Sequence, residues 1–143
     1  MALYRTASEE ETIALGERIA GELPARAAVL LIGNLGAGKT TIAKGIVKGL
    51  GAAPPEEVSS PTFTLIHEYG AGGRVFHVDL YRLEDAREAA TLGLDDLFDR
   101  EAVVLIEWGE RFPQLMPQYR IEIRLRAADP QSDEREIEVT RMP

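Results

Sequence analysis

The sequence predicts an α/β fold, a three-layer sandwich with a mainly parallel central sheet and antiparallel hairpins at its edges. Residues 27–32 and 102–106 are continuously apolar, as strands buried on both faces of a parallel sheet are. Apolar residues at helical spacing lie between the strands, and alternating apolar and polar residues near the C-terminus indicate a half-exposed hairpin. The 143-residue chain contains neither internal repeats nor a long linker, so we expect a single domain over residues 1–143.

The first predicted helix covers residues 9–22. Ser8 stands at the N-cap position and Glu11 follows three residues later, which is the pattern of a capping box. Apolar residues then recur at close to helical spacing until Pro24, where the helix cannot continue. The next apolar run, residues 27–32, is the first buried strand.

The second predicted helix covers residues 39–50 and directly follows a glycine-rich loop. Gly51 ends it, because glycine adopts the left-handed conformation that commonly follows a helix. Residues 62–69 and 75–81 are predicted strands. The glycine-rich residues 70–73 join these strands as a hairpin turn.

The second half of the chain continues the alternation of helices and strands. Residues 84–99 are acidic and rich in alanine, and Gly93 interrupts them, which suggests one or two short helices. Residues 102–106 form the second fully buried strand. Residues 121–126 and 137–139 alternate between apolar and charged, which predicts a half-exposed antiparallel hairpin at the sheet edge.

The segment between the first buried strand and the second helix matches the pattern G-x-x-x-x-G-K-[ST]. Backbone N–H groups of such a loop point inward, and together with the helix N-terminus they bind the β- and α-phosphates of a nucleotide. The strand–loop–helix context makes a turn that binds nothing improbable, and it gives the fold the character of a P-loop NTPase. The predicted nucleotide-binding residues are Gly33, Asn34, Leu35, Gly36, Ala37, Gly38, Lys39, Thr40 and Thr41.

Three side chains of this loop have separate predicted roles. Lys39 is expected to reach the β- and γ-phosphate oxygens, and the Thr40 hydroxyl to bind Mg²⁺. Thr41 lies one residue further into the helix, from where its hydroxyl reaches the α-phosphate. A nucleotide with Mg²⁺ is therefore the expected cofactor.

Two carboxylates are candidates for the second group that a nucleotide-bound Mg²⁺ requires at a neighbouring strand end. Glu107 follows the uninterrupted apolar run 103–106, and Asp79 follows the weaker strand pattern of residues 75–78. The alternative role of either carboxylate is to cap a helix or to pair with an arginine. Glu107 is the stronger metal candidate, because only a bound cation would offset its burial against phosphates.

Four further features near these motifs have less specific interpretations. Trp108 either covers the site or simply packs. His67 and His77 have no partner at metal-ligand spacing and are interpreted as packing or surface residues. The hydroxyl-rich residues 59–64 have the position of a segment that senses the γ-phosphate, although a β-turn explains their composition almost as well.

Composition excludes several classes of function. With 16 Lys+Arg against 24 Asp+Glu, the net charge is −8, which argues against autonomous nucleic-acid binding and against stable DNA binding. Without cysteine the chain has no thiol catalysis, disulfide or Cys-ligated metal site. Apolar runs are short and the N-terminus has no signal-peptide pattern, so we expect a cytoplasmic protein without a membrane partner.

Among nucleotide-binding proteins, two classes are disfavoured. The only asparagine is Asn34 in the loop itself, whereas a Ras-like GTPase needs Asn-Lys-x-Asp to recognise guanine. The Leu-Ser-Gly-Gly-Gln segment of transporter ATPases is also missing. A small-molecule P-loop kinase remains an alternative, although Arg82 and Arg87 are too few to make an arginine-rich lid.

Four sequence blocks, in their order and spacing, resemble the bacterial TsaE (YjeE) family. They are residues 33–41, 60–65, 77–83 (His-Val-Asp-Leu-Tyr-Arg-Leu) and 105–108 (Leu-Ile-Glu-Trp). The resemblance implies an Mg²⁺-dependent ATPase that acts with the proteins TsaB and TsaD. Together they form threonylcarbamoyladenosine at position 37 of tRNAs that read ANN codons, and TsaD carries out the transfer itself.

The resemblance also implies roles for individual residues. The loop binds ATP, Thr40 and Glu107 hold Mg²⁺, Asp79 is required for hydrolysis, and Lys39 completes the catalytic set. Asn34 departs from the aspartate of many members, in a side chain that need not touch phosphate. Partner subunits would hold the tRNA, in keeping with the acidic charge of this chain. ATP binding or hydrolysis would reset the complex between turnovers, and basal hydrolysis would be slow.

Overall fold

The computed structural model of this protein describes residues 1–61, 65–72, 74–129 and 131–142. Its strands are β1 (Ala2–Thr6), β2 (Ala27–Ile32), β3 (Ile66–Tyr69), β4 (Val75–Asp79), β5 (Val103–Glu107), β6 (Arg120–Ala127) and β7 (Arg135–Met142). Its α-helices are α1 (Glu9–Ala20), α2 (Lys39–Gly49), α3 (Ala86–Ala90) and α4 (Leu94–Asp99). Short 3₁₀ turns are η1 (Pro55–Glu57), η2 (Gly109–Arg111) and η3 (Pro113–Leu115).

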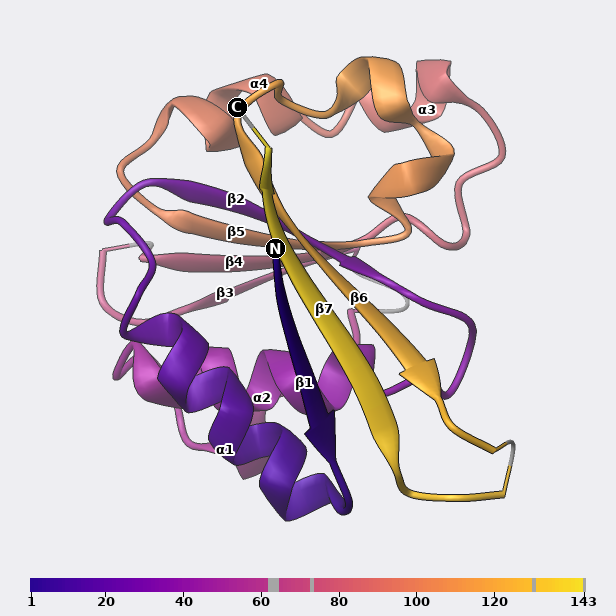
Figure 1. The fold of residues 1–143 in the computed structure, drawn as a ribbon. Helices are drawn as coiled ribbons and strands as arrows, with labels where there is room; N and C mark the ends of the chain where they lie inside the picture. Colours follow the sequence, from indigo (N-terminus) through magenta and orange to yellow (C-terminus); the bar gives the residue numbers. More distant parts are fainter. Residues whose placement is uncertain (62–64, 73, 130, 143) are drawn as a thin grey trace.

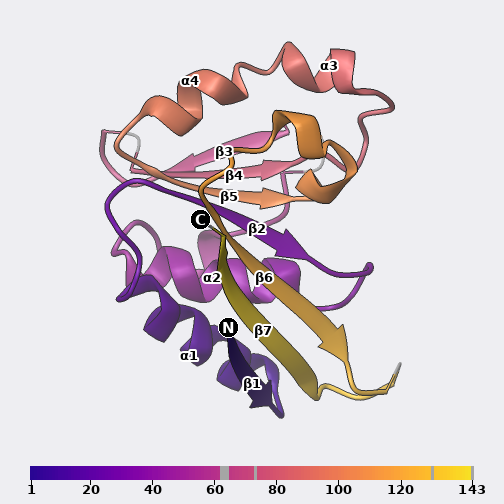
Figure 2. The ribbon, with the colours of Figure 1, turned by 45° about the horizontal axis from the view of Figure 1, so that its top comes forward.

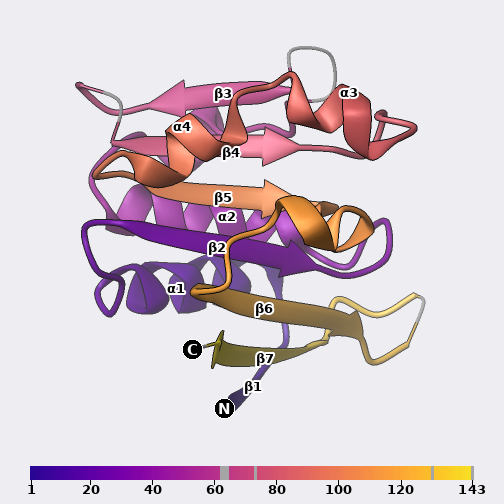
Figure 3. The same ribbon diagram turned by 90° about the horizontal axis from the view of Figure 1, so that it is seen from above.

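The strands form one seven-stranded sheet in the order β1-β7-β6-β2-β5-β4-β3, as the view from above shows (Figure 3). Helices α1 and α2 cover one face, and α3 and α4 lie on the other (Figures 1 and 2). The central pairs β6–β2, β2–β5 and β5–β4 are parallel, whereas β3–β4, β6–β7 and β1–β7 are antiparallel. The predicted three-layer α/β class with a mainly parallel centre is confirmed.

The predicted elements differ from the observed ones most clearly at the N-terminus. Strand β1 was not predicted, and it pairs with β7 in the register Leu3↔Glu138. The C-terminal hairpin was predicted to form an edge of the sheet. That prediction is wrong, because β1 lies outside β7 and β6 pairs with β2. Only Thr6 of β1 is buried, so the strand carries too little apolar alternation to be recognised.

The hairpin of β3 and β4 is shorter than predicted. Residues 62–64 of the first predicted strand lie outside the described residues, and β3 begins after Leu65, whose φ of 66° is incompatible with extended backbone. Strand β4 ends at Asp79 because the chain turns there, with the amide of Tyr81 donating to Asp79 Oδ1 at 2.9 Å. Strands β3 and β4 pair as the predicted antiparallel hairpin, with residue 73 of its turn outside the described residues. The two short helices predicted around Gly93 are present.

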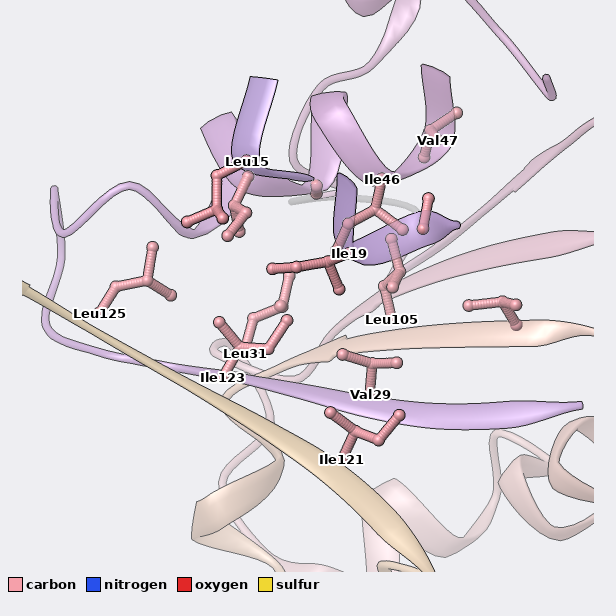
Figure 4. Packing of buried hydrophobic residues seen from close by; sticks show 14 of the residues in the cluster. Leu15, Ile19, Val29, Leu31, Ile46, Val47, Leu105, Ile121, Ile123 and Leu125 are labelled. Carbon is pink, nitrogen blue, oxygen red and sulfur yellow. The ribbon is translucent and has the colours of Figure 1, made fainter. Parts of the chain in front are cut away.

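Two apolar clusters hold the layers together. Strand residues point alternately to opposite faces, so the same parallel strands supply both clusters. Figure 4 shows the cluster beneath α1 and α2, which includes Leu15, Ile19, Val29, Leu31, Ile46, Val47, Leu105, Ile121, Ile123 and Leu125. The cluster on the other face includes Leu30, Phe76, Val78, Leu80, Leu94, Val104, Ile106 and Phe112. No helix among the described residues is both long and apolar enough to cross a membrane.

Helices α1 and α2 pack with their backbones in close contact. A Cβ at Gly45 would lie 2.1 Å from the carbonyl oxygen of Ile13, and one at Gly16 would lie 2.6 Å from that of Ile42. Neither neighbour is a side chain that can rotate away. Glycine at these positions therefore sets the distance between the helices and the seat of α2, whose first residue is Lys39.

Gly45→Ala should destabilise the protein by about 1–3 kcal/mol, because the added methyl group has to push two helix backbones apart. The free energy of unfolding, measured by urea titration with circular dichroism, tests this expectation. Gly21→Ala is the matched control: its Cβ would meet only the Arg18 carbonyl oxygen at 3.5 Å, in ordinary α backbone. We expect that control to be neutral or up to about 1 kcal/mol more stable. Equal effects of the two substitutions would contradict the close-packing argument.

Candidate active site

Three strand ends meet at one edge of the sheet. Strands β2, β5 and β4 are parallel, so their carboxyl ends point the same way, and Asp79 and Glu107 are direct register partners. The loop of residues 33–38 leaves this edge from the end of β2. Ligands of open α/β sheets bind outside the carboxyl ends of the strands. The topology therefore brings the predicted phosphate loop and both predicted carboxylates to one place.

The loop leads directly into helix α2. Gly38 is the N-cap residue with a φ of 106°, a left-handed conformation that favours glycine. Among the described residues, no side chain caps the helix at this position, so the first amides of α2 have no side-chain acceptor there. Free amides and the positive end of the helix dipole together favour an anion.

A cavity of about 510 Å³ lies at this edge, within the range of small-molecule and cofactor sites. It is lined by Glu9, Thr12, Leu35, Gly36, Gly38, Lys39, Thr40, Thr41, Ser60, Asp79, Tyr81, Glu107, Trp108, Asp133 and Arg135. Three predicted loop residues are not among them. Gly33 packs against the Leu125 backbone, Ala37 is buried, and Asn34 is exposed.

Lys39 is buried in this cavity, with 5% of its surface exposed. Its Nζ lies 3.5 Å from the centroid of the Trp108 ring, and no hydrogen-bond partner for it is found in the described part of the chain. Burial lowers the pKa of Lys39, while the negative charges of Glu107, Glu110 and Asp79 oppose that shift. The ammonium group is thus held by an aromatic face and surrounding carboxylates, with its donors unused.

Glu107 is buried at the end of β5 with 4% exposure. Its Oε2 accepts a hydrogen bond from the Thr40 hydroxyl at 3.4 Å and lies 2.5 Å from His77 Nε2. The sequence interpretation of His77 as a packing or surface residue is incomplete. Its ring is fully buried, but it also contacts the carboxylate of the site.

Asp79 has both carboxylate oxygens oriented by neighbours. Oδ2 accepts from the Ser60 hydroxyl at 2.8 Å, and Oδ1 accepts from the Tyr81 amide at 2.9 Å. Ser60 belongs to the hydroxyl-rich segment 59–64, of which residues 62–64 lie outside the described residues. Asp79 is 7% exposed and lines the cavity beside Glu107, so these two contacts orient its carboxylate within the site.

Trp108 both packs and covers the site. Its backbone has a φ of 66°, which turns the chain sharply after β5 and is unusual for a bulky residue. The indole lies over Lys39, and its centroid is 5.1 Å from that of the half-exposed Tyr81. The two aromatic rings and Lys39 all line the cavity.

The residues present fit a nucleotide with a divalent cation. Within the described part of the chain, a buried ammonium group without a hydrogen-bond partner, uncapped helix amides, and a hydroxyl 3.4 Å from a carboxylate converge on one cavity. Magnesium at such a loop typically takes one or two protein oxygens and completes its shell with phosphate oxygens and water. No group of three His, Cys, Asp or Glu side chains suited to a metal ion occurs within the described residues.

Two residues at this edge were missed by sequence reasoning. Arg135, at the start of β7, lines the cavity and contacts the loop from almost a hundred residues away in the chain. Glu110 lies in η2, and its Oε1 is buried without a hydrogen-bond partner in the described part of the molecule. Neither belongs to a local motif. The only feature of the sequence that could have indicated Glu110 is its place two residues after the Leu-Ile-Glu-Trp block.

Comparisons with known proteins identify similar chains. A family model described as threonylcarbamoyl adenosine biosynthesis protein TsaE matches residues 6–137. The tRNA threonylcarbamoyladenosine biosynthesis protein TsaE of Bacillus subtilis is 42% identical over 138 residues, which cover 96% of this chain and 84% of that protein. The protein of the same name from Haemophilus influenzae is 40% identical over 112 residues, covering 78% and 68%.

A solved structure is similar in the same way. The crystal structure of YdiB from Bacillus subtilis superposes with a TM-score of 0.78 at 36% sequence identity, covering 99% of this chain and 86% of that one. The similarity therefore extends over the entire sheet and both helical layers, including the edge that holds the cavity.

Glu110→Gln should raise the stability of the protein at neutral pH. Burial raises the pKa of Glu110, with Lys39, Arg124 and Arg111 opposing the shift. The folded state therefore binds this proton more tightly than the unfolded state. Stability associated with Glu110 is present below the ordinary glutamate pKa and is lost as pH rises through the raised value. The glutamine variant should lack this loss.

Thermal unfolding of both proteins across the acidic to neutral range tests this sign. Glu122→Gln is the control, because Glu122 is more deeply buried than Glu110, at 7% exposure, but pairs with Arg120 at 2.8 Å and Arg124 at 3.0 Å. Removing that charge should lower stability, since it leaves two cations without their partner. If Glu110→Gln is less stable than the parent at neutral pH, the fold stabilises the charged carboxylate of Glu110, and the prediction is wrong.

Proposed function

This chain belongs to the TsaE family of threonylcarbamoyl adenosine biosynthesis proteins, and on that premise we propose that it is the Mg²⁺-dependent ATPase of this tRNA modification. The observation that carries the proposal is the buried Lys39 ammonium group, which has no hydrogen-bond partner among the described residues and faces the loop cavity. A buried cation without an acceptor is costly. The β- and γ-phosphates of ATP would provide the missing acceptors.

The binding step divides among residues of the loop. Amides at the start of α2 and the Lys39 ammonium group receive the phosphates, and the Thr41 hydroxyl reaches the α-phosphate. To do so, Lys39 has to leave the face of Trp108, which lies 3.5 Å away. Thr40 and Glu107 would hold Mg²⁺, which supplies charge neutralisation at the β- and γ-phosphates. His77 keeps the Glu107 carboxylate directed toward Thr40.

The hydrolytic step is assigned to Asp79. Its carboxylate is held by Ser60 and by the Tyr81 amide, and it lies next to Glu107 at the strand ends. From there it is suited to orient water toward the γ-phosphate. The cavity offers no arginine other than Arg135, whose hydrogen bonds go to backbone carbonyls within the described chain. A partner that supplies a positive charge can accelerate such a reaction by about 10³–10⁵.

Membership of the family supports a cellular role in tRNA modification. We propose that the chain acts with TsaB and TsaD and that its ATPase cycle permits repeated turnover of threonylcarbamoyladenosine formation. The net charge of −8 supports tRNA contact through the partner subunits and not through this chain alone. Slow hydrolysis by the isolated chain, increased by the partners, is the corresponding kinetic expectation.

Lys39→Ala should abolish sustained tRNA modification. Loss of the ammonium group removes the one buried cation of the cavity that is free to bind phosphate oxygens within the described residues, so ATP affinity should fall by about tenfold or more. The assay counts threonylcarbamoyladenosine per TsaD over time, with ATP, TsaB, TsaD and each variant. Lys48→Ala is the control, because Lys48 is exposed and pairs with Glu17 at 2.8 Å.

The same assay, together with a measurement of γ-phosphate transfer, distinguishes the proposed role from that of a small-molecule kinase. Repeated turnover in the complete absence of this chain would overturn the proposed role. Stoichiometric transfer of the γ-phosphate to a small metabolite would instead favour the small-molecule kinase.

Glu107→Gln should separate metal binding from hydrolysis. A neutral amide loses the charge that holds the cation, so the Mg²⁺ dependence of ATP binding should weaken by about tenfold. Asp79→Asn, the matched substitution at the neighbouring strand end, should reduce the hydrolysis rate more than binding. Calorimetric titrations of ATP with and without Mg²⁺, together with phosphate-release rates, distinguish the two residues. An unchanged Mg²⁺ dependence in Glu107→Gln would contradict its role as a metal ligand.

A further inference from the structure

We infer that Arg135 is a positioning residue of the phosphate loop, which it holds from the outside in the conformation that receives a nucleotide. Its Nε donates to the carbonyl oxygen of Ala37 at 2.9 Å, and its Nη2 donates to that of Gly36 at 3.2 Å. The planar guanidinium therefore spans two successive carbonyls of the loop. The inference rests on the proposed nucleotide binding and adds a residue that none of the sequence motifs contains.

The guanidinium group is itself held rigidly. Nη1 donates to the carbonyl oxygens of Ser132 at 2.6 Å and Glu134 at 3.0 Å, in the connection that leads into β7. Arg135 also lies in the β-ladder, opposite Ala127 of β6 and Thr6 of β1. The backbone and the guanidinium group of Arg135 are thus held by contacts that do not involve the phosphate loop. Such a group can hold a loop in place instead of moving with it.

The contacts are on the side of the loop where they are needed. In a phosphate loop successive N–H groups point toward the anion, so carbonyl oxygens face the other way and need donors. Gly36 and Ala37 receive theirs from Arg135. The Ala37 carbonyl belongs to the same peptide unit as the Gly38 amide, at the start of α2. A cation on that carbonyl polarises the unit and strengthens the amide as a donor.

Arg135 also contributes charge. Within the described residues no carboxylate forms an ion pair with its guanidinium, and its recorded hydrogen bonds all go to backbone carbonyls. Its positive charge therefore remains available to the cavity that it lines. Lysine cannot replace it fully, because an ammonium group lacks the planar fork that reaches two carbonyls at once.

Three proteins test this inference: Arg135→Met, Arg135→Lys and the control Arg141→Met. Arg141 lies on the same strand, and its Nη2 donates to the Glu22 carbonyl oxygen at 3.1 Å, a comparable contact to backbone outside the cavity lining. The first measurement is hydrogen exchange of amides 36–39 in nucleotide-free protein. We expect faster exchange of these amides in Arg135→Met, with the exchange of amides in the sheet unchanged. Arg141→Met should exchange like the wild-type protein.

The second measurement is ATP affinity by calorimetry with Mg²⁺ present. Loss of two charge-assisted hydrogen bonds should weaken binding by about 10–100-fold in Arg135→Met, with Arg135→Lys between it and the parent. The maximal hydrolysis rate at saturating ATP should change less than the affinity. If Arg135→Met does not fold, Arg135→Lys decides. Wild-type exchange of amides 36–39 together with affinity within about twofold of the parent overturns the inference.

The two proposals fail in different ways. If the parent protein does not bind ATP, the proposed function is wrong, and the exchange experiment still decides whether Arg135 holds the loop. If the parent binds ATP and Arg135→Lys matches it in both exchange and affinity, the role of the guanidinium fork is wrong and the proposed function stands.

Discussion

Parallel pairing of three buried strands is the constraint on which the site depends. Strands β2, β5 and β4 run side by side in a register that sets Asp79 beside Glu107, and each strand is covered on both faces. Parallel strands must end at the same edge, so a loop after one strand and carboxylates at the ends of the others necessarily converge. Apolar packing above and below makes a shift of register costly, since one residue of slip would turn the carboxylates into the opposite layer.

The electrostatics of the cavity follow from this packing. Lys39, Asp79 and Glu107 are each less than a tenth exposed, and they lie within one region together with His77. Burial of charged groups is unfavourable unless they are paired. Among the described residues the pairing is partial, because Glu107 has its contacts while the Lys39 ammonium group has an aromatic face in place of an acceptor. A polyanion with its cation would complete these interactions.

The outer elements of the fold serve as supports for this edge. Close backbone contact at Gly16 and Gly45 seats α2, whose N-terminus is part of the cavity. On the opposite side of the loop, the C-terminal hairpin delivers Arg135 to the loop carbonyls. Strand β1 covers the outer edge of β7, the strand that carries Arg135. The loop is therefore held between a helix packed through glycines and a strand that the N-terminus secures.

Local pattern alone determined much of this protein: the buried strands at residues 27–32 and 102–106, the helix after the glycine-rich loop, and carboxylates at strand ends. Those features depend on residues close in the chain, where periodicity and glycine placement are informative. Only the tertiary structure decided that His77 contacts Glu107, that Trp108 lies over Lys39, that Arg135 reaches the loop, and that β1 is the edge strand next to β7. Each of the first three is a contact between side chains or backbone brought together by strand order, and β1 gains its place by backbone pairing. These contacts and this strand pairing leave no periodic signal in the sequence, because they depend on which segments become neighbours in space.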